Sequence, residues 1–527
     1  MKPNFIKSPQ SLVLEAVQHD GGRICFFYDQ QYYLCDADLH SATKLFESFV
    51  DIHKSKYKIQ TKQAASWHDC TKYKPVFDFI SFDAWFAGLD FLSETPFPCH
   101  EATLLLELAP RRFTTCLRKI LYNFVATQWK KINLTSAAYF EQFLLAIEPA
   151  LVTATKEMRY FFAHARAYIF LIRNGLLSAI KQPNSNSPQK LLDEFDKYIE
   201  RESLSSDNSA AFVAVSNLRG QILSLYDRES AALEFDNCKK LDCDLVATFY
   251  LDMGVNTYYG VVEVDTKVIA DRVAEIKASQ KVISDLRKGD LIVTLSVDPD
   301  FFRIYMPLLF FYAQQLRDID FHIVLCADLH IAMDLVNDGA IYCSALARLN
   351  AQPPPENVSF SSIAIPKFCN ANKTFYACAR FFVIDRLLEN YSSVFVMDAD
   401  MTIQEDPRPF FASLAKHKFG LPKTKGLEFL SPWRRYMAGS VFINGTEDNC
   451  VLIKEIQIYL TKGLAEGNSW MLDQNALAFA LETTPNGHSF DLNTVKRPMG
   501  QPSLRTAWEV NFRARKEKND NEQARVV

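Results

Sequence analysis

Two carboxylates, Asp398 and Asp400, follow a short apolar run, and their types and spacing are suited to binding a metal. The run at residues 394–397 has no polar alternation, which is typical of a strand buried on both faces of a parallel sheet. Ligands of such sheets bind beyond the carboxyl ends of the strands. Side chains at positions i and i+2 of an extended chain point to the same side, so both carboxylates can hold one hard cation. Mg²⁺ or Mn²⁺ carrying the phosphates of a substrate fits this pair.

The elements that position this pair alternate between strand and helix after about residue 286. Strands are expected at 291–297, 321–327, 358–365 and 394–397, and helices at 301–316, 333–349 and 374–389. This alternation predicts a doubly wound α/β sheet. Right-handed crossovers bring the ends of parallel strands to one edge, so we expect Ser296, Val297 and Asp298 near Asp398.

The expected helix before the carboxylates carries Tyr376 and Arg380, which are four residues apart and therefore on one helix face. Arg380 stands among apolar neighbours, where a positive charge needs a partner such as Asp398 or a phosphate. A structural ion pair with Asp385 or Glu389 is the alternative.

Two later segments are candidates for the same site. Residues 437–444 are expected to form a strand in which Gly439 lets a ligand come close, although a plain bulge explains the glycine equally well. Asp473 and Gln474 open an apolar helix at 475–481. An acidic residue at a helix start serves either as a cap or as part of an active site.

The segments 373–388, 394–401, 437–444 and 470–477 together resemble the Asp-x-Asp type of GT-A nucleotide-sugar glycosyltransferases in order and spacing. The resemblance covers roughly residues 288–516. It implies a GT-A fold, a Rossmann-like doubly wound mixed sheet, with Asp398 and Asp400 holding Mn²⁺ or Mg²⁺. Further roles are implied as follows: donor binding by Ser296, Val297, Tyr376, Arg380 and Gly439, and catalysis by Asp473 and Gln474.

The resemblance is less complete towards residue 516. Members of the class often carry a late histidine as third metal ligand, and the candidates here are His488 and Asn511. Arg513, Arg515 and Lys516 are expected to meet the donor diphosphate, or else to form a solvated tail. The implied partners are a nucleotide-diphosphate sugar, with UDP favoured by the class, and a glycan, lipid-linked glycan or protein acceptor.

Two rival functions remain open. Residues 397–402 also fit the Asp-x-Asp-x-Thr motif of haloacid-dehalogenase-like phosphohydrolases, in which Asp398 would be the nucleophile. Several expected strands precede the motif and no second acidic cluster follows it, which disfavours that class. The other rival is a non-catalytic binding protein with a degenerate transferase domain, which the intact Asp398, Asp400 and Asp473 disfavour.

The whole chain of 527 residues is long enough for two or three domains. We expect a small α/β segment of unknown role at 1–95, a mostly helical domain at 96–285, the GT-A domain at 286–516 and a disordered tail at 517–527. Lys and Arg total 58 against 62 Asp and Glu, so no overall charge favours nucleic acid. With no apolar leader or spanning segment in view, a cytoplasmic location is expected, with peripheral membrane contact left open. The twelve cysteines have no zinc-type spacing and are expected to be buried thiols.

Overall fold

The structure is a computed structural model of the chain. It describes residues 11–19, 23–28, 31–35, 58–62, 74–75, 121, 124, 134–176, 187–201, 209–248, 252–262, 267–350, 353–467, 470–485, 487 and 489–500. The chain divides into two compact units. Unit 1 comprises Met1–Arg219 and Asp236–Leu251, and unit 2 comprises Gly220–Phe235 and Asp252–Val527.

Unit 1 contains a five-stranded sheet with the strand order β4-β1-β2-β3-β5. Its strands are β1 (Ser11–His19), β2 (Arg23–Tyr28), β3 (Gln31–Cys35), β4 (Lys58–Lys62) and β5 (Lys74–Pro75). The helices between residues 134 and 248 are α6 (Leu134–Ile147), α7 (Lys156–Arg173), α9 (Ser187–Arg201), α10 (Ser209–Leu223) and α11 (Arg228–Thr248). The end of α10 and the start of α11 belong to unit 2, because the residues 220–235 are assigned to that unit. Much of the range 96–285 lies outside the described residues, so the helical domain expected there stays a prediction.

Unit 2 is built on an eight-stranded mixed sheet with the strand order β14-β12-β13-β10-β7-β8-β9-β6. Its strands are β6 (Lys281–Val282), β7 (Gly289–Val297), β8 (Asp320–Leu325), β9 (Val358–Ser362), β10 (Tyr391–Met397), β12 (Phe419–Leu421), β13 (Ser440–Asn444) and β14 (Phe490–Asp491). Strands β10, β7, β8 and β9 are parallel, and β13 runs antiparallel to β10. A small antiparallel pair, β11 (Thr402–Ile403) and β15 (Met499–Gly500), lies outside this sheet.

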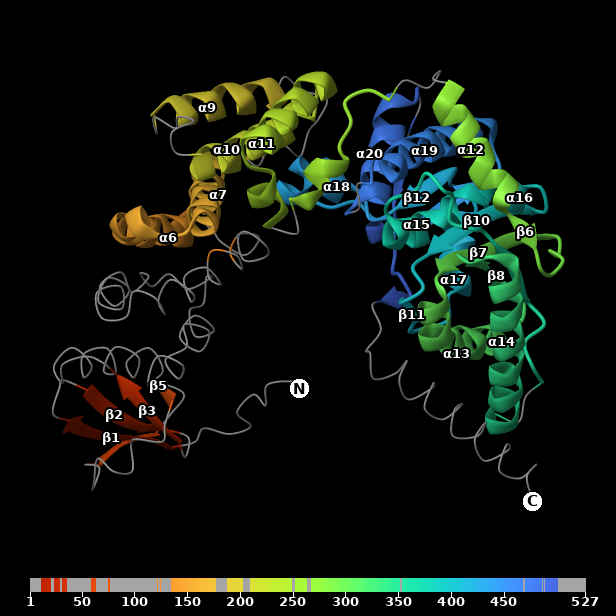
Figure 1. The fold of residues 1–527 in the computed structure, drawn as a ribbon, viewed down its shortest axis with the longest axis horizontal. Coiled ribbons are helices and arrows are strands. Elements are labelled where there is room, and N and C mark those ends of the chain that lie inside the picture. The colour runs from red at the N-terminus through yellow and green to blue at the C-terminus, as the bar shows by residue number, and fades with distance from the viewer. Residues whose placement is uncertain are drawn as a thin grey trace. The chain divides into compact units, whose positions relative to one another are not determined.

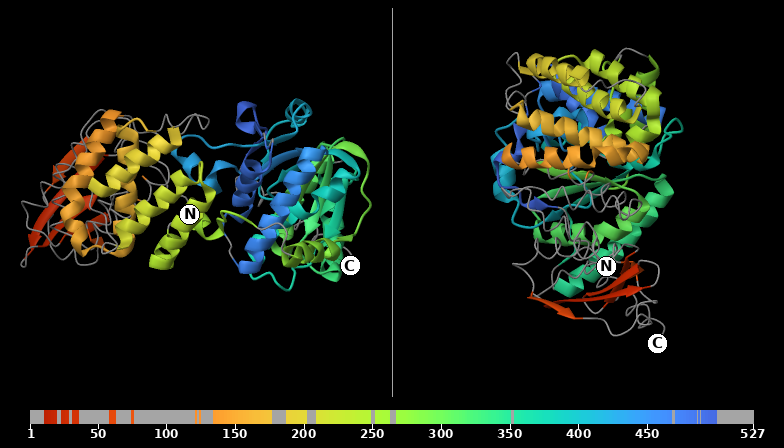
Figure 2. Two further views of the ribbon diagram at one scale, coloured as in Figure 1. Left: turned by 90° about the horizontal axis from the view of Figure 1, so that it is seen from above. Right: turned by 90° about the vertical axis from the view of Figure 1, so that its left-hand side faces the viewer.

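Helices cover both faces of this sheet (Figure 1), and the views in Figure 2 agree with this layering. The helices are α12 (Lys267–Ser279), α13 (Pro299–Gln315), α14 (Leu329–Asn350), α15 (Asn372–Cys378), α16 (Ile384–Leu388), α17 (Arg408–Leu414), α18 (Pro432–Arg435), α19 (Glu447–Glu466) and α20 (Leu472–Thr483). Val394 and Val396 of β10 pack in the core formed with α15, α19 and α20, whereas Phe395 and Met397 pack in the core formed with α13 and α17. The apolar run therefore serves two cores at once, as predicted for a doubly wound sheet.

The helix expected at 374–389 is wrong in one respect, because it is not continuous. Helix α15 ends at Cys378, a 3₁₀ turn (η6, Ala379–Phe382) follows, and α16 starts at Ile384. Every residue from Ala379 to Ile384 is at most 3% exposed, and one face of a regular α-helix cannot bury six consecutive side chains. Tyr376 and Arg380 consequently do not share a continuous helix face.

Candidate active site

The site lies where the parallel strands of unit 2 end. Asp398 follows β10 directly, and Asp298 follows β7, its parallel neighbour. Strand β13 starts at the same edge because it runs antiparallel to β10, and the Asp398 amide donates a hydrogen bond to the carbonyl of Gly439 at 3.1 Å. The predicted meeting of strand ends at one edge of the sheet is confirmed.

Arg380 is the centre of the site. Its side chain is 3% exposed, and its guanidinium donates to the carboxylate of Asp398 and, at 3.4 Å, to Asp473. It also donates to the carbonyls of Met397 at 3.2 Å and Ala438 at 3.3 Å. The prediction that buried Arg380 pairs with Asp398 is confirmed, and the 3₁₀ turn is what directs its side chain to the strand ends.

Neither of the alternative partners of Arg380, Asp385 and Glu389, is among the groups to which its guanidinium donates. Asp385 accepts hydrogen bonds from Lys277 and, at 3.2 Å, from Gln457. The Nε atom of Arg380 is buried without a hydrogen-bond partner among the described residues. Arg380 therefore holds the acidic residues of the site together through the two terminal nitrogens of its guanidinium.

Asp473 lies in the first turn of α20 and faces Arg380. Burial raises the pKa of its carboxyl group, with a further rise from the charge of Asp398, while Arg380 opposes both effects. One carboxylate oxygen accepts the backbone N–H of Gln474 at 2.9 Å. Asp473 thus lies at the start of a helix and belongs to the acidic cluster, but it is not the cap of α20, whose N-cap is Met471 without a side-chain hydrogen bond.

Asp400 is the third carboxylate of the cluster. Burial raises the pKa of Asp400, and repulsion by the negative charge of Asp398 raises it further. Tyr305 on α13 is a neighbour that the sequence did not reveal: burial raises the pKa of its hydroxyl, and the charge of Asp400 adds to the rise. Its position in an apolar helix gave no signal that it would approach the carboxylates.

Gly439 is needed for close packing within the site. A Cβ atom at this position would clash with the carboxylate of Asp398. The close approach predicted for this glycine is present, but the group that approaches is a side chain of the same protein. The strand expected at 437–444 starts at Ser440, so Gly439 immediately precedes β13.

The residues expected on the donor side lie beside β7. The Ser296 hydroxyl donates to the carbonyl of Tyr376, and Val297 is 1% exposed, within the core. Only the backbone of Val297 can therefore contact a ligand. Asp298 caps α13 by accepting the amides of Asp300 and Phe301, both at 2.8 Å. Burial raises the pKa of the Tyr376 hydroxyl, and the charge of Asp298 adds to this.

Five predicted site residues lie outside the described part of the chain: His488, Asn511, Arg513, Arg515 and Lys516. Within the described residues, no group of three or more His, Cys, Asp and Glu side chains is arranged to hold a metal ion. The Asp398–Asp400 pair nevertheless suits Mg²⁺ or Mn²⁺, because such ions bind through one or two carboxylates and keep the remaining positions for water and phosphate. Arg380 pairs with two carboxylates, Asp398 and Asp473, and Asp400 adds a third negative charge beside Asp398, so the ionised cluster has an excess of negative charge that a cation would balance.

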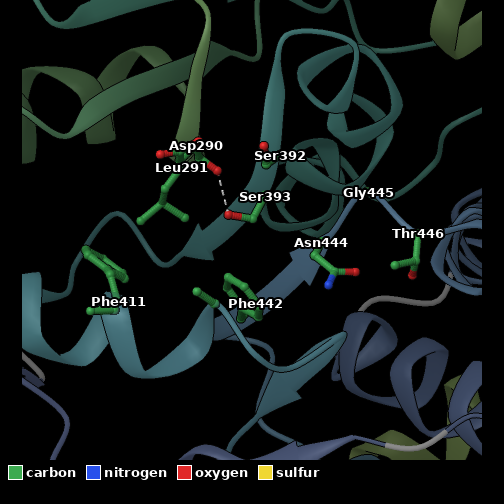
Figure 3. Close-up of a pocket in the computed structure, with 11 residues that line it drawn as sticks. Asp290, Leu291, Ser392, Ser393, Phe411, Phe442, Asn444, Gly445 and Thr446 are labelled. Atoms are coloured by element: carbon green, nitrogen blue, oxygen red, sulfur yellow. Dashed lines mark hydrogen bonds between the residues drawn. The ribbon is translucent and has the colours of Figure 1, made fainter.

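A cavity of about 520 Å³ lies at the opposite edge of the sheet (Figure 3). Leu291 and Ser393, near the amino ends of β7 and β10, line it together with Asn444 at the end of β13. Phe411 and Phe442 form its apolar wall. This cavity is remote from the carboxylates and is not part of the candidate active site.

Neither a protein-family model nor a curated protein sequence matches the chain. Similar solved structures include the bifunctional glycosyltransferase WbbM in its apo form, with 13% identity, a TM-score of 0.25 and 38% of each chain covered. Glycosyltransferase GlyE of Streptococcus pneumoniae TIGR4 shows 11% identity and a TM-score of 0.28 over 45% of this chain and 64% of its own. Galactosyltransferase LgtC, in complex with donor and acceptor sugar analogues, shows 12% identity and a TM-score of 0.28 over 42% of this chain and 95% of its own.

The match spans less than two thirds of the length of WbbM and GlyE. Among the described helices, none is both long and apolar enough to cross a bilayer.

Proposed function

We propose that this protein is a metal-dependent glycosyltransferase of the GT-A class that transfers a sugar from a nucleoside-diphosphate donor. One observation carries the proposal: Asp398, Asp473 and the buried Arg380 meet in one ion-pair cluster at the carboxyl ends of parallel strands, with Asp400 beside it. Doubly wound sheets bind their ligands at this edge. The cluster joins residues from three of the four segments that carry the resemblance to the class, 373–388, 394–401 and 470–477, although Asp398 and Asp473 are more than seventy residues apart in the chain.

Asp398 and Asp400 would hold Mn²⁺ or Mg²⁺ against the donor diphosphate. A bound divalent cation supplies stabilisation of the negative charge that develops on a departing nucleoside diphosphate. The chain prepares this site through Arg380, which keeps Asp398 in place and offsets part of the repulsion among the carboxylates. Gly439 leaves the space that the Asp398 carboxylate occupies.

Asp473 and Gln474 would contact the transferred sugar or the acceptor. The raised pKa of Asp473 suits a group that holds or moves a proton during the reaction, since burial favours its neutral form. Ser296, the Val297 backbone and Tyr376 border the same edge of the sheet and would receive the nucleoside. A UDP-sugar donor and a glycan, lipid-linked glycan or protein acceptor are proposed by analogy with the class, and a cytoplasmic location is proposed separately.

A donor screen tests the proposal. The full chain is incubated with UDP-, GDP- and CMP-sugars and Mn²⁺, and release of the nucleotide is recorded with and without EDTA. We expect release from one donor class that EDTA abolishes and that Asp400→Asn lowers by about a hundredfold, within the range for loss of one electrostatic contact to the transition state. Asp406→Asn removes a surface carboxylate that pairs with Arg408, and this control variant should retain full activity.

The same protein separates the rival functions. A haloacid-dehalogenase-like phosphohydrolase would form an aspartyl phosphate at Asp398 and hydrolyse para-nitrophenyl phosphate. Steady phosphate release from this substrate would therefore overturn the transferase proposal. Tight nucleotide-sugar binding without turnover of any donor or acceptor would instead favour a non-catalytic binding protein.

A further inference from the structure

The first turn of α20, which carries Asp473, is anchored by a segment that precedes the whole sheet. This segment is the 3₁₀ turn η5 (Met253–Thr257), about thirty residues before β7 and outside the range that resembles glycosyltransferases. The side-chain amide of Asn475 donates to the carbonyl of Gly254 at 2.8 Å and to the Thr257 hydroxyl at 2.9 Å. Both Asn475 and Thr257 are at most 1% exposed.

The Thr257 hydroxyl can donate one hydrogen bond, and two backbone carbonyls lie within reach of it. The Thr257 hydroxyl has one proton and lies 3.1 Å from the carbonyl of Gly254 and 3.0 Å from the carbonyl of Trp470. The Trp470 carbonyl is the nearer acceptor, and the Gly254 carbonyl has a second donor in the amide of Asn475, so we assign the hydroxyl proton to the Trp470 carbonyl. The backbone of Thr257 is held in turn, because its carbonyl accepts the hydroxyl of Tyr459 at 2.7 Å.

The carbonyl of Trp470 precedes an unusual backbone conformation. Met471 has φ 57° and ψ 26°, and it is the one residue other than glycine with positive φ in the described part of the chain. Side chains disfavour this left-handed conformation, so neighbouring contacts must hold it. Two contacts do so: Thr257 fixes the carbonyl before Met471, and Leu472 after it is fully buried against Gly463 of α19, where a larger residue would clash.

We infer that Thr257 and Asn475 are positioning residues, which hold the left-handed turn at Met471 and thereby aim Asp473 at Arg380. Neither residue touches the reacting groups. Asn475 fixes the helix two residues after Asp473, and Thr257 fixes the chain three residues before it. The kinetic consequence rests on the proposed transferase function, whereas the structural consequence for the Asp473–Arg380 pair does not.

The kinetic test compares Thr257→Val, which keeps the size and removes the hydroxyl, with Thr257→Ser, which restores the hydroxyl. We expect Thr257→Val to lower kcat about tenfold with the donor KM nearly unchanged, because the donor-binding strand ends are intact. Thr257→Ser should restore most of kcat. Thr461→Val is the matched control, since it also removes a fully buried hydroxyl that donates to a backbone carbonyl, at 2.7 Å to Gln457. Should Thr257→Val fail to fold, Thr257→Cys replaces it under the same criteria.

A second test does not need activity. The coupling between Asp473→Asn and Arg380→Met is measured by urea unfolding in EDTA, with Thr257 intact and in the Thr257→Val background. The double-mutant cycle gives the interaction between Asp473 and Arg380 as a ratio of equilibrium constants for unfolding. We expect this ratio to fall about fivefold when the Thr257 hydroxyl is absent. An unchanged coupling, or a kcat loss no larger than that of Thr461→Val, would overturn the inference. If the wild-type protein transfers no sugar, the proposed function fails and the coupling measurement alone decides the positioning role.

Discussion

Arg380 offers the sharpest test of the site, because one buried guanidinium neutralises two carboxylates and satisfies two carbonyls. The change Arg380→Met keeps much of the apolar stem and removes the charge. Asp398 and Asp473 then face each other without a cation, and both carbonyls lose their donor. Breaking a buried ion pair by removing one partner costs about 3–5 kcal/mol.

This free energy converts to a large thermal shift. For domains of 150–250 residues, 1 kcal/mol corresponds to about 2–4 °C, so the Tm of unit 2 should fall by roughly 6–20 °C. The measurement is thermal unfolding by circular dichroism in EDTA at pH 7.5. Adding Mn²⁺ should recover part of the loss, because a cation at Asp398 and Asp400 replaces some of the missing positive charge.

Arg408→Met is the control for this experiment. Arg408 also pairs with two carboxylates, Asp318 at 2.6 Å and Asp406 at 3.1 Å, but its side chain is 44% exposed. Exposed pairs contribute about 0–1 kcal/mol each, so losing both should lower the Tm of the Arg408→Met variant by at most about 8 °C. If Arg380→Met lowers the Tm no more than Arg408→Met does, Arg380 does not hold a buried acidic cluster.

Three further outcomes are expected. Burial raises the pKa of Asp400, so its charge destabilises the metal-free protein at neutral pH, and Asp400→Asn should raise the Tm in EDTA while weakening Mn²⁺ binding at least about tenfold by calorimetry. Gly439→Ala forces the carboxylate of Asp398 to move and should also weaken Mn²⁺ binding, whereas Gly445→Ala meets no atom closer than 3.6 Å and should not. Burial lowers the pKa of His322 to about 3, so the protein takes up a proton on unfolding between pH 6.5 and 3. The free energy of unfolding therefore falls as the pH is lowered, by about 1.4 kcal/mol per pH unit at most. In His322→Gln, the free energy of unfolding measured with urea should depend less on pH between pH 7 and 5.

The sequence by itself determined the local elements around the carboxylates. An uninterrupted apolar run ending in Asp398 predicts a strand between two cores, and β10 has one core on each face. The burial of Arg380 among apolar residues predicted an acidic partner, and it pairs with Asp398. Both inferences succeed because periodicity and the desolvation of a charge act on residues close together in the chain.

The tertiary structure alone decided which distant segments complete the site. Asp473 meets Arg380 across more than ninety residues of sequence, Tyr305 approaches Asp400 from α13, and Thr257 supports the start of α20. Such contacts depend on the order of strands in the sheet and on which helix covers which face, and local patterns do not encode either. The break between α15 and α16 has the same origin, because burial against two neighbours at once overrides helical periodicity.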